Sequence, residues 1–544
     1  MRLNSKACAR RHGCDSPAPP APRFLAALGV LRLRRNAGPK KPTNDAMTMA
    51  RLIDAVKRRP QAVFAGFLVV HGLVWTALPS LLHFNLPVDV IEALTYGREW
   101  QLGYDKLPPL PWWMVEAAYQ LFGTDAAIYA LGQIAVIVAF VAVWLTARPL
   151  VGSTGALAAI LIIDGMHYFN FSAAKFNHNV SELPFWALAG FAFHAGLRHG
   201  RLRHWILLGL ALGLAWWAKY FVVILAAPLA LFLLLDRDAR RRLAGPGPWI
   251  AAAVALMVVA PHLIWLAHND FLPFSYAEAR ATTPRGVLDH LLNPAIYVVG
   301  QAYFLIPTLL IAVPLLWPPS KAPQRTKADA FDRRIVTLLA FGPALTLLAF
   351  SLLTGRGTNA MWGFPLWLFL GAWILIFAPA ALDRLRLLWI GVLWLTVSAI
   401  LVAAFLADYL VLPPLDHRFR AALFPGVELS AAITHRFEAA TGHEPKYVIG
   451  STWDGGNVAH YAAQRPQPRV LIDGVPRAAP WIDLADLRAH GAGLVWTDGD
   501  LHALPLDFAA IAPGAEIGTP FDLPLHRDDG TVHVGWAILR PQSK

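Results

Sequence analysis

The chain alternates between long apolar runs and short polar connections over most of its length. A helix needs about 20 apolar residues to cross the hydrocarbon core of a bilayer, and the runs have about this length. We therefore predict an all-α polytopic membrane domain with about eleven spanning helices, near 61–82, 126–147, 153–169, 181–197, 204–218, 220–235, 248–266, 294–317, 335–353, 360–379 and 386–411.

The pattern changes at about Asp416, where charged residues, Gly and Pro become more frequent. Short β-like runs at 446–450, 469–473, 493–496 and 532–539 alternate there with helical stretches at 427–441 and 483–490. This alternation predicts a small α/β domain. The chain thus divides into a leader at 1–46, a membrane domain at 47–412 and a water-soluble C-terminal domain at 413–544.

The composition agrees with this division, since 56% of the residues are hydrophobic and only 15% are charged. The formal net charge of +12 could suggest a nucleic acid partner. However, the Lys and Arg residues between 47 and 413 gather in alternate connections, nineteen on one side and seven on the other. This is the positive-inside bias, which predicts a cytoplasmic N-terminus and, with an odd number of spans, an external C-terminal domain.

The leader is rich in Arg, Pro and Ala and contains both cysteines, Cys8 and Cys14. We interpret it as a disordered cytoplasmic tail, or as untranslated if Met47 or Met49 is the true start. No disulfide framework or Cys metal site is expected in the rest of the chain.

The first outer connection, 83–125, carries the most informative polar residues. Asp89 and Glu92 are three apart, so a helix would place them on one face just above the membrane. A carboxylate there can act as a general base on a hydroxyl or amine acceptor. The pair can equally hold a divalent cation. The alternative is an ordinary helix start, because acidic residues after Pro87 suit the positive end of the helix dipole.

Positive charges on the side poor in Lys and Arg point to an anionic ligand. They are Arg98, Lys106, Lys175, Lys219, Arg280, Arg285 and Arg356. A lipid phosphate needs cationic partners at headgroup depth, so we predict phosphate contacts for Lys106, Lys219, Lys175 and Arg356. Lys219 could instead snorkel from a helix end. Arg356 lies between glycines and could belong to an ordinary turn.

Further polar and aromatic residues accompany these cations. Tyr104 and Tyr220 adjoin Lys106 and Lys219, and Asn177 and His178 lie in a polar outer connection that suits sugar hydroxyls. The same connection also suits a helix start capped by Asn179 or Ser181. Asp164 lies inside a predicted span, where a carboxylate is either functional or paired with a neighbouring helix. The loop-then-helix pattern at 451–461 suits either an anion or sugar cradle or a simple turn.

The acidic pair, the Gly103-Tyr104-x-Lys106-x-Pro108-Pro109 run and the following Trp112-Trp113 resemble glycosyltransferase family 39 of the GT-C class. This family includes protein O-mannosyltransferases and the lipid A aminoarabinose transferase. The likeness extends through 171–186, the 216–220 turn and 262–271. One departure concerns Leu107, because related sequences often carry His before the two prolines, and a donor- or metal-binding role at this position is therefore in doubt.

The resemblance implies a bacterial inner-membrane enzyme that transfers a hexosyl or pentosyl group from a polyprenyl-phosphate carrier to an acceptor lipid, glycan or protein outside the cytoplasm. Inversion at the sugar is implied, with Asp89 in the place of the catalytic carboxylate and Glu92 at a second acidic position. No cofactor or metal ligand is assigned, apart from the divalent cation that the acidic pair could hold. The alternative is a transporter or lipid flippase, which would have charges near the bilayer midplane and broken helices.

Overall fold

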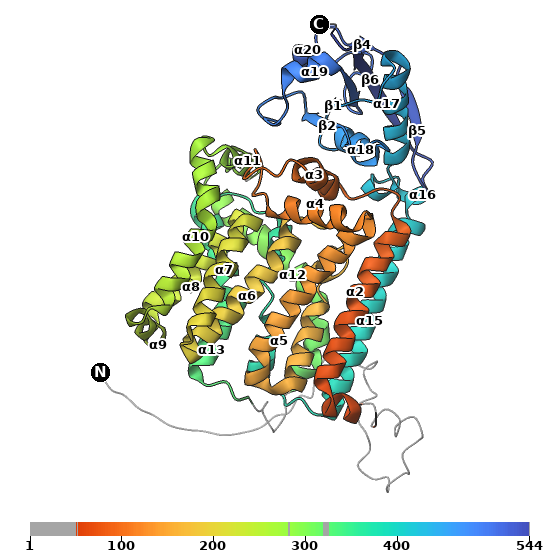
Figure 1. The fold of residues 1–544 in the computed structure, drawn as a ribbon. Helices are drawn as coiled ribbons and strands as arrows, with labels where there is room; N and C mark the ends of the chain where they lie inside the picture. The colour runs from red at the N-terminus through yellow and green to blue at the C-terminus, as the bar shows by residue number, and fades with distance from the viewer. Residues whose placement is uncertain (1–50, 52, 281–282, 319–325, 543–544) are drawn as a thin grey trace, which may run out of the picture. The chain divides into compact units, whose positions relative to one another are not determined.

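The computed structural model of the protein describes residue 51 and residues 53–280, 283–318 and 326–542. The predicted leader, with Cys8 and Cys14, lies outside the described residues, as do Lys321 and Arg325. Each predicted span contains a helix, and most boundaries agree within a few residues (Figure 1). These helices are α2 (Pro60–Leu82), α5 (Asp125–Asp164), α6 (His178–His199), α7 (Leu202–Ala218), α8 (Val223–Leu235), α10 (Gly247–His268), α12 (Asp289–Leu316), α13 (Ala330–Thr354), α14 (Leu370–Phe377) and α15 (Arg384–Leu410).

The number of spans differs from the prediction. Among the described residues, six helices are long and apolar enough to cross a membrane, namely α2, α5, α10, α12, α13 and α15. A seventh results if the bent pair Tyr220–Leu235 and Arg237–Ala244 is one span. The count of about eleven is therefore not confirmed. Helices α7 and α14 have 17 and 8 residues, fewer than the roughly 20 that cross a hydrocarbon core.

Helix α5 is a single run of 40 residues that reverses at Gly152, whose backbone is not helical (φ 75°, ψ 167°). The ring of Phe140 lies 5.8 Å from that of His71, and Asp164 Oδ1 lies 3.1 Å from His71 Nδ1. In a straight helix, residues 140 and 164 would be about 36 Å apart, at 1.5 Å per residue. The predicted spans 126–147 and 153–169 therefore correspond to the two arms of α5.

The predicted span 360–379 is broken. It begins with a 3₁₀ turn at Ala360–Gly363, continues through further turns, and becomes an α-helix only at α14. The carbonyl of Ala360 accepts hydrogen bonds from Tyr168 Oη at 2.6 Å and Gln301 Nε2 at 2.9 Å. Irregular backbone is tolerated at membrane depth only where protein groups satisfy it, and these two side chains satisfy the carbonyl of Ala360.

Asp164 joins three helices. Besides its contact with His71 of α2, its Oδ2 accepts a hydrogen bond from Trp394 Nε1 of α15 at 2.7 Å. Asp164 and His71 are only 3% and 5% exposed. The pairing with neighbouring helices accounts for a carboxylate at this depth, where an unpaired one would be costly.

Asp164→Leu is expected to lower the melting temperature of the detergent-solubilised protein, because it leaves the buried donor of Trp394 without an acceptor. Such a group costs about 1–3 kcal/mol of stability. Asp164→Asn retains an acceptor oxygen and should melt close to the wild-type protein. Equal melting of the Leu variant and the wild type, by differential scanning fluorimetry, would contradict a structural role for Asp164.

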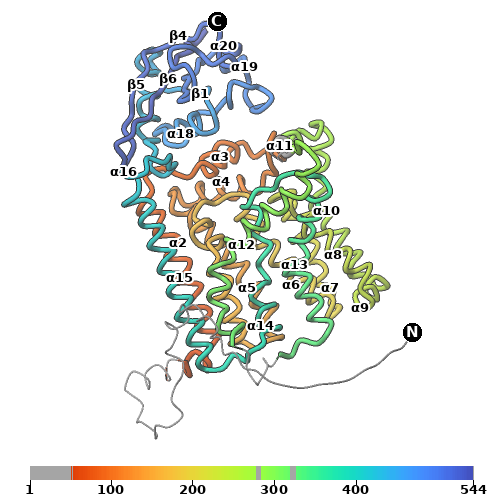
Figure 2. Tube along the Cα trace, turned by 180° about the vertical axis from the view of Figure 1, so that it is seen from behind, coloured from red at the N-terminus to blue at the C-terminus, as the bar shows by residue number. Residues whose placement is uncertain are grey.

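The first outer connection forms two helices, α3 (Val88–Gly97) and α4 (Leu110–Phe122). They pack closely, since a Cβ placed on Gly97 would lie only 2.4 Å from the carbonyl oxygen of Trp112. Both helices lie across one end of the helical bundle, between it and the C-terminal sheet (Figures 1 and 2). The predicted helical turn at Asp89 and Glu92 is the beginning of α3.

The C-terminal part contains a six-stranded sheet of order β2-β1-β3-β6-β4, with β5 paired to β6. Strands β2, β1 and β3 are parallel, and β6 runs antiparallel to β3. The predicted α/β character is confirmed, and all four predicted β-like runs are strands. The strands are β1 (Tyr447–Gly450), β2 (Arg469–Ile472), β3 (Ala492–Trp496), β4 (Glu516–Ile517), β5 (Phe521–Pro524) and β6 (Thr531–Leu539). The main helices are α17 (Gly426–Thr441), α18 (Asp454–Tyr461), α19 (Leu484–His490) and α20 (Leu506–Ile511).

Helix α18 fastens this sheet to α3. A Cβ on Gly456 would lie 2.6 Å from Thr95 Oγ1, so the glycine allows the two helices to touch. Tyr461 Oη accepts a hydrogen bond from the backbone of Leu86 at 3.1 Å. Gly456, one of the glycines of the 451–461 pattern, therefore serves close packing against the site-bearing helix. A second tie is the ion pair between Arg469 and Glu99.

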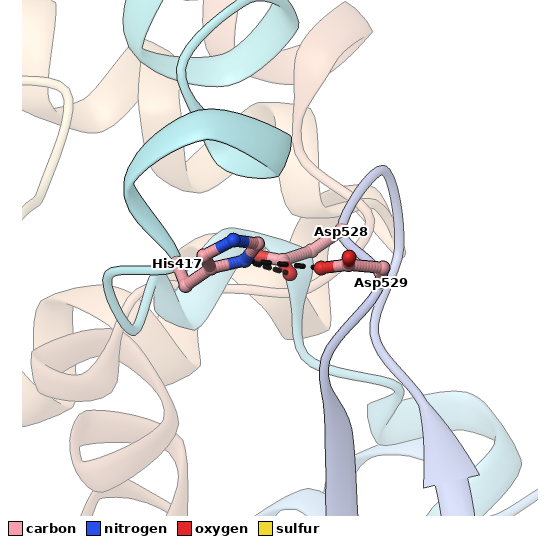
Figure 3. Close-up of side chains that lie close together, drawn as sticks. All are labelled: His417, Asp528 and Asp529. Atoms are coloured by element: carbon pink, nitrogen blue, oxygen red, sulfur yellow. Dashed lines mark hydrogen bonds and ion pairs between the residues drawn. The ribbon is translucent and has the colours of Figure 1, made fainter.

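The short elements complete the connections. The end of α15 continues into α16 (Pro413–Asp416), and His417 then faces Asp528 and Asp529 of the β5–β6 turn at 3.4 and 3.0 Å (Figure 3). The other short helices are η2 (His167–Phe169), η3 (Tyr220–Val222), α9 (Arg237–Arg240), η4 (Arg241–Ala244), α11 (Leu272–Arg280), η5 (Ala360–Gly363) and η6 (Ala421–Leu423).

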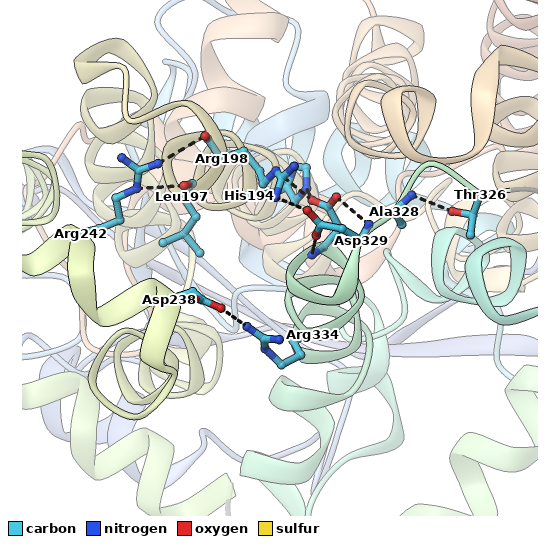
Figure 4. Close-up of polar contacts among 10 residues, drawn as sticks. His194, Leu197, Arg198, Asp238, Arg242, Thr326, Ala328, Asp329 and Arg334 are labelled. Atoms are coloured by element: carbon cyan, nitrogen blue, oxygen red, sulfur yellow. Dashed lines mark hydrogen bonds and ion pairs between the residues drawn. The ribbon is translucent and has the colours of Figure 1, made fainter.

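The opposite end of the bundle carries many of the arginines of the predicted cytoplasmic connections. Arg198 pairs with Asp329 at 2.7 Å, and Arg334 pairs with Asp238 at 2.7 Å (Figure 4). His194 Nε2 lies 2.9 Å from Asp332 Oδ1. These pairs join α6, α9 and α13, so part of the basic charge that marks this side also ties helix ends together.

Candidate active site

Asp89 lies in the first turn of α3 and is held by the start of α6. Its Oδ2 accepts a hydrogen bond from Asn177 Nδ2 at 3.0 Å. The other amide atom, Asn177 Oδ1, accepts from the backbone N–H groups of Asn179 and Val180 and caps α6. Asn177 is therefore both the helix cap and the residue that orients Asp89. The predicted cap at Asn179 or Ser181 is wrong, because both residues lie inside α6, which begins at His178.

Asp89 opens onto a cavity of about 330 Å³ that Lys175 also lines. The rest of the wall comes from the chain around the end of the last long helix, with Asp408, Tyr409, Arg418 and Arg420. Arg420 is 7% exposed and pairs with Asp408 at 3.1 Å and Asp416 at 2.8 Å. Arg418 is 82% exposed, and its Nε lies 3.7 Å from Asp416. The cavity is thus lined by a carboxylate, an exposed lysine and an exposed arginine.

Sequence reasoning missed Arg418 and Arg420. A signal was present, because both follow the last span on the predicted outer side and flank Phe419, as Lys219 adjoins Tyr220. The charge count ended at Pro413 and so left them out. A count extended to 420 would have added two further cations to the side poor in positive charge.

Glu92 pairs with Lys106, whose Nζ lies 3.0 Å from Glu92 Oε2. Burial raises the pKa of Glu92, and Lys106 only partly opposes this shift. Burial would lower the pKa of Lys106, but Glu92 and Asp105 more than offset it, so this pKa is raised. Lys106 therefore stays positively charged beside a carboxyl group that binds a proton more readily than usual.

Lys219 faces a polar cluster on α6. Its Nζ donates to Asn179 Oδ1 and lies 3.5 Å from Glu182 Oε1. Glu182 is fully buried, and the lysine side chain is 13% exposed. Lys219 is therefore mostly buried against α6, whereas a snorkelling lysine would extend its amino group into solvent. Because Asn177 holds Asp89 and Asn179 holds Lys219, the first turn of α6 links the two residues.

The remaining predicted residues have internal partners. Tyr104 is 2% exposed, and its hydroxyl donates to the Tyr96 carbonyl at 2.7 Å. His178 is 7% exposed and lies 3.2 Å from the Pro108 carbonyl. Tyr220 Oη lies 2.8 Å from His262 Nε2. Arg356 pairs with Glu278 at 3.2 Å. Their predicted contacts with donor phosphate or sugar remain predictions.

A cation site can be sought among His and carboxylate groups that converge. Within the part of the chain that the structure describes, one group of three meets this condition, and it consists of His417, Asp528 and Asp529 (Figure 3). Their ligand atoms lie within 4.8 Å of one another. Asp89 and Glu92 are not joined by a third such ligand among those residues, so the divalent cation at the acidic pair remains a prediction.

Asn177→Ser should separate the two roles of Asn177. Serine can still cap α6, so the melting temperature should stay near that of the wild type, whereas Asn177→Ala should lose about 0.5–2 kcal/mol of stability. Both variants lose the hydrogen bond to Asp89, and both should lose activity in a sugar-transfer assay. Wild-type activity in the Ser variant would exclude the proposed orientation of Asp89.

Comparison with known proteins bears on the function of these residues. Residues 106–265 match the family described as dolichyl-phosphate-mannose-protein mannosyltransferase. The lipid A galacturonosyltransferase RgtD of Rhizobium johnstonii is 30% identical over 217 residues, which are 38% of this chain and 44% of that protein. The lipopolysaccharide core galacturonosyltransferase RgtB of the same organism is 27% identical over 231 residues, or 41% and 45% of the two chains. The match thus spans less than half the length of these relatives.

The fold has a solved counterpart. The crystal structure of ArnT from Cupriavidus metallidurans bound to undecaprenyl phosphate superposes with a TM-score of 0.57 at 13% sequence identity. The superposition covers 87% of this chain and 97% of that one, so it includes the membrane bundle and extends beyond the region of the sequence matches. The chain is thus similar to this mannosyltransferase family over residues 106–265 and shares its fold with ArnT, and both findings agree with the resemblance seen in the sequence.

Proposed function

We propose that the protein transfers a sugar from a polyprenyl-phosphate carrier to an acceptor on the extracytoplasmic face of the bacterial inner membrane. The observation that carries this proposal is the placement of Asp89, which is fixed by Asn177 and opens onto a cavity shared with Lys175. The Glu92–Lys106 pair lies one helical turn further along α3. Carboxylate and cations thus meet at the end of an apolar bundle, as a lipid-phosphate donor requires.

In the proposed reaction, Asp89 accepts the proton of an acceptor hydroxyl as its oxygen attacks the anomeric carbon. The bond between this carbon and the phosphate oxygen breaks on the opposite side, so the configuration inverts. The electron pair leaves with the polyprenyl phosphate. Lys106, Lys175 and Lys219 stabilise the negative charge on the departing phosphate, and Arg418 adds a further cation at the cavity.

Donor and acceptor classes follow from the relatives. The ArnT structure contains undecaprenyl phosphate, and the curated relatives are named for transfer of galacturonic acid to lipid A or to lipopolysaccharide core. We therefore propose a polyprenyl-phosphate sugar as donor and a membrane glycan as acceptor. Residues 47–412 would form the catalytic domain with its N-terminus in the cytoplasm, and residues 413–544 would form a periplasmic domain.

The proposal is tested by offering purified protein in lipid vesicles a panel of radiolabelled polyprenyl-phosphate sugars that includes a neutral hexose, a uronic acid and an aminopentose. With lipid A or lipopolysaccharide core as acceptor, we expect one donor to be consumed, with release of polyprenyl phosphate. A transporter would consume none of them and would instead move labelled lipid or solute across the bilayer. This second outcome would refute the transferase.

A further inference from the structure

Two adjoining cavities lie beside the loop that follows α3, apart from the cavity at Asp89. Their volumes are about 290 and 210 Å³. Asp105, Leu272 and Arg477 line both of them, so the two form one double cavity. Its walls come from the loop 103–105, from residues 265–276 and from the C-terminal segment 475–481. The loop 103–105 and the C-terminal part therefore share this space.

The walls combine aromatic rings with planar polar groups. Trp265 lies directly on the backbone of Gly103, where a Cβ would be 2.2 Å from the Trp265 ring. Trp481 packs edge-on against Tyr104, with 5.7 Å between the ring centroids. Asp105, Asn269 and Asp270 contribute carboxylate and amide groups. Apolar faces with a few directional polar groups are typical of small-ligand sites, and a saccharide uses both kinds of contact.

Arg477 and Asp105 supply the charges of this double cavity. The Arg477 side chain is exposed, and no ion pair joins it to a carboxylate in the described part of the chain. A guanidinium can form two parallel hydrogen bonds with a carboxylate or phosphate. Asp105 is held in place, because its Oδ1 accepts a hydrogen bond from Tyr96 Oη at 2.9 Å. One available cation thus faces a fixed hydrogen-bond acceptor across the cavity.

We infer that the double cavity binds the saccharide of the acceptor, with Arg477 on a carboxylate or phosphate that it carries and Asp105 on a hydroxyl. This inference rests on the proposed function and names the substrate subsite. The donor phosphate belongs at headgroup depth beside the spans, whereas this cavity lies between an outer loop and the C-terminal part.

The path from the double cavity to the proposed base is short. Asp105 adjoins Lys106, whose Nζ lies 3.0 Å from Glu92. Glu92 and Asp89 are three residues apart on α3, a rise of about 4.5 Å. A saccharide held by Arg477 and Asp105 can therefore extend a hydroxyl past the Glu92–Lys106 pair to Asp89.

The test measures binding without relying on turnover. The full-length protein in nanodiscs is titrated with core oligosaccharide released from lipopolysaccharide by mild acid and, in a second arm, with lipid A. We expect Arg477→Glu to weaken binding of at least one probe tenfold or more. Arg488→Glu, the same charge reversal at an exposed residue of α19 outside the cavity, should leave the affinity unchanged.

Donor consumption by the same protein with Asp89 intact, measured beside the titration, separates this inference from the proposed function. Binding that depends on Arg477 but occurs without consumption of any donor supports the saccharide site and counts against transfer. Equal affinity of the Arg477→Glu variant and the wild type would overturn the inference, as would failure of both probes to bind saturably. A rise in KM for the donor with unchanged acceptor binding would also overturn it, because the cavity would then belong to the donor.

Discussion

Asp89→Asn is expected to abolish sugar transfer, with kcat reduced by about 10²- to 10⁴-fold, the usual contribution of a positioned general base. The amide cannot accept the acceptor proton. Its oxygen can still accept the hydrogen bond that Asn177 donates to Asp89, so the local structure should persist. The substitution thus removes the proposed chemistry and leaves the contacts in place.

The measurement is single-turnover transfer from a radiolabelled polyprenyl-phosphate sugar, with the melting temperature as a check of folding. Asp89→Glu is a useful companion, because it keeps the carboxylate but displaces it from Asn177, and it should retain part of the activity. As a matched control, Asp408→Asn alters another carboxylate of the same cavity, one already paired with Arg420. Full activity in Asp89→Asn would exclude Asp89 as the base.

Much of the fold was predictable, because hydropathy and β-like runs are local signals. Helices α2, α5, α6, α7, α8, α10, α12, α13 and α15 and strands β1, β2, β3 and β6 lie where the sequence predicted them. The number of membrane spans was harder to predict from the sequence. A stretch such as 360–379 is apolar enough to cross a membrane, yet its first half has turns whose carbonyl at Ala360 is satisfied by Tyr168 and Gln301. Distant side chains of this kind leave no periodic signal in the stretch itself.

The site was predictable in part, for a related reason. The spacing of Asp89 and Glu92 indicated a shared helical face, and both indeed lie on α3. The contact between Asp89 and Asn177 joins residues 88 positions apart, and no local pattern indicates it. Likewise, Lys106 and Glu92 are 14 positions apart and meet because the chain returns to α3 after Gly97. The residues were recognisable by type, whereas their pairing depends on tertiary structure.

Lys106→Met is expected to lower kcat/KM for the donor by about 10- to 100-fold. It removes a charge-assisted contact to the carrier phosphate, which is typically worth about 1.5–3 kcal/mol. Methionine keeps much of the side-chain volume, so packing near Tyr96 should change little. Initial rates at varied donor concentration would show the loss both as a higher KM and as a lower kcat, because the contact exists in the ground state and strengthens as charge develops on the departing phosphate. An unchanged KM and kcat would exclude Lys106 from the donor site.

Lys106→Met should also change the pH dependence of stability, an effect that can be measured without sugar transfer. Burial already raises the pKa of Glu92 above its ordinary value of 4.5, and Lys106 counteracts this rise. Without Lys106 the pKa rises further, so the folded state binds a proton at Glu92 more tightly than the unfolded chain. Stability from this group is then fully present below about pH 4.5 and is lost as the pH rises through the raised pKa. The melting temperature of Lys106→Met should therefore fall relative to the wild type over this range.

The double variant Glu92→Gln, Lys106→Met has no titrating group at either position and should lack the extra pH dependence. If both variants melt in parallel at every pH, Lys106 does not limit the rise in the pKa of Glu92.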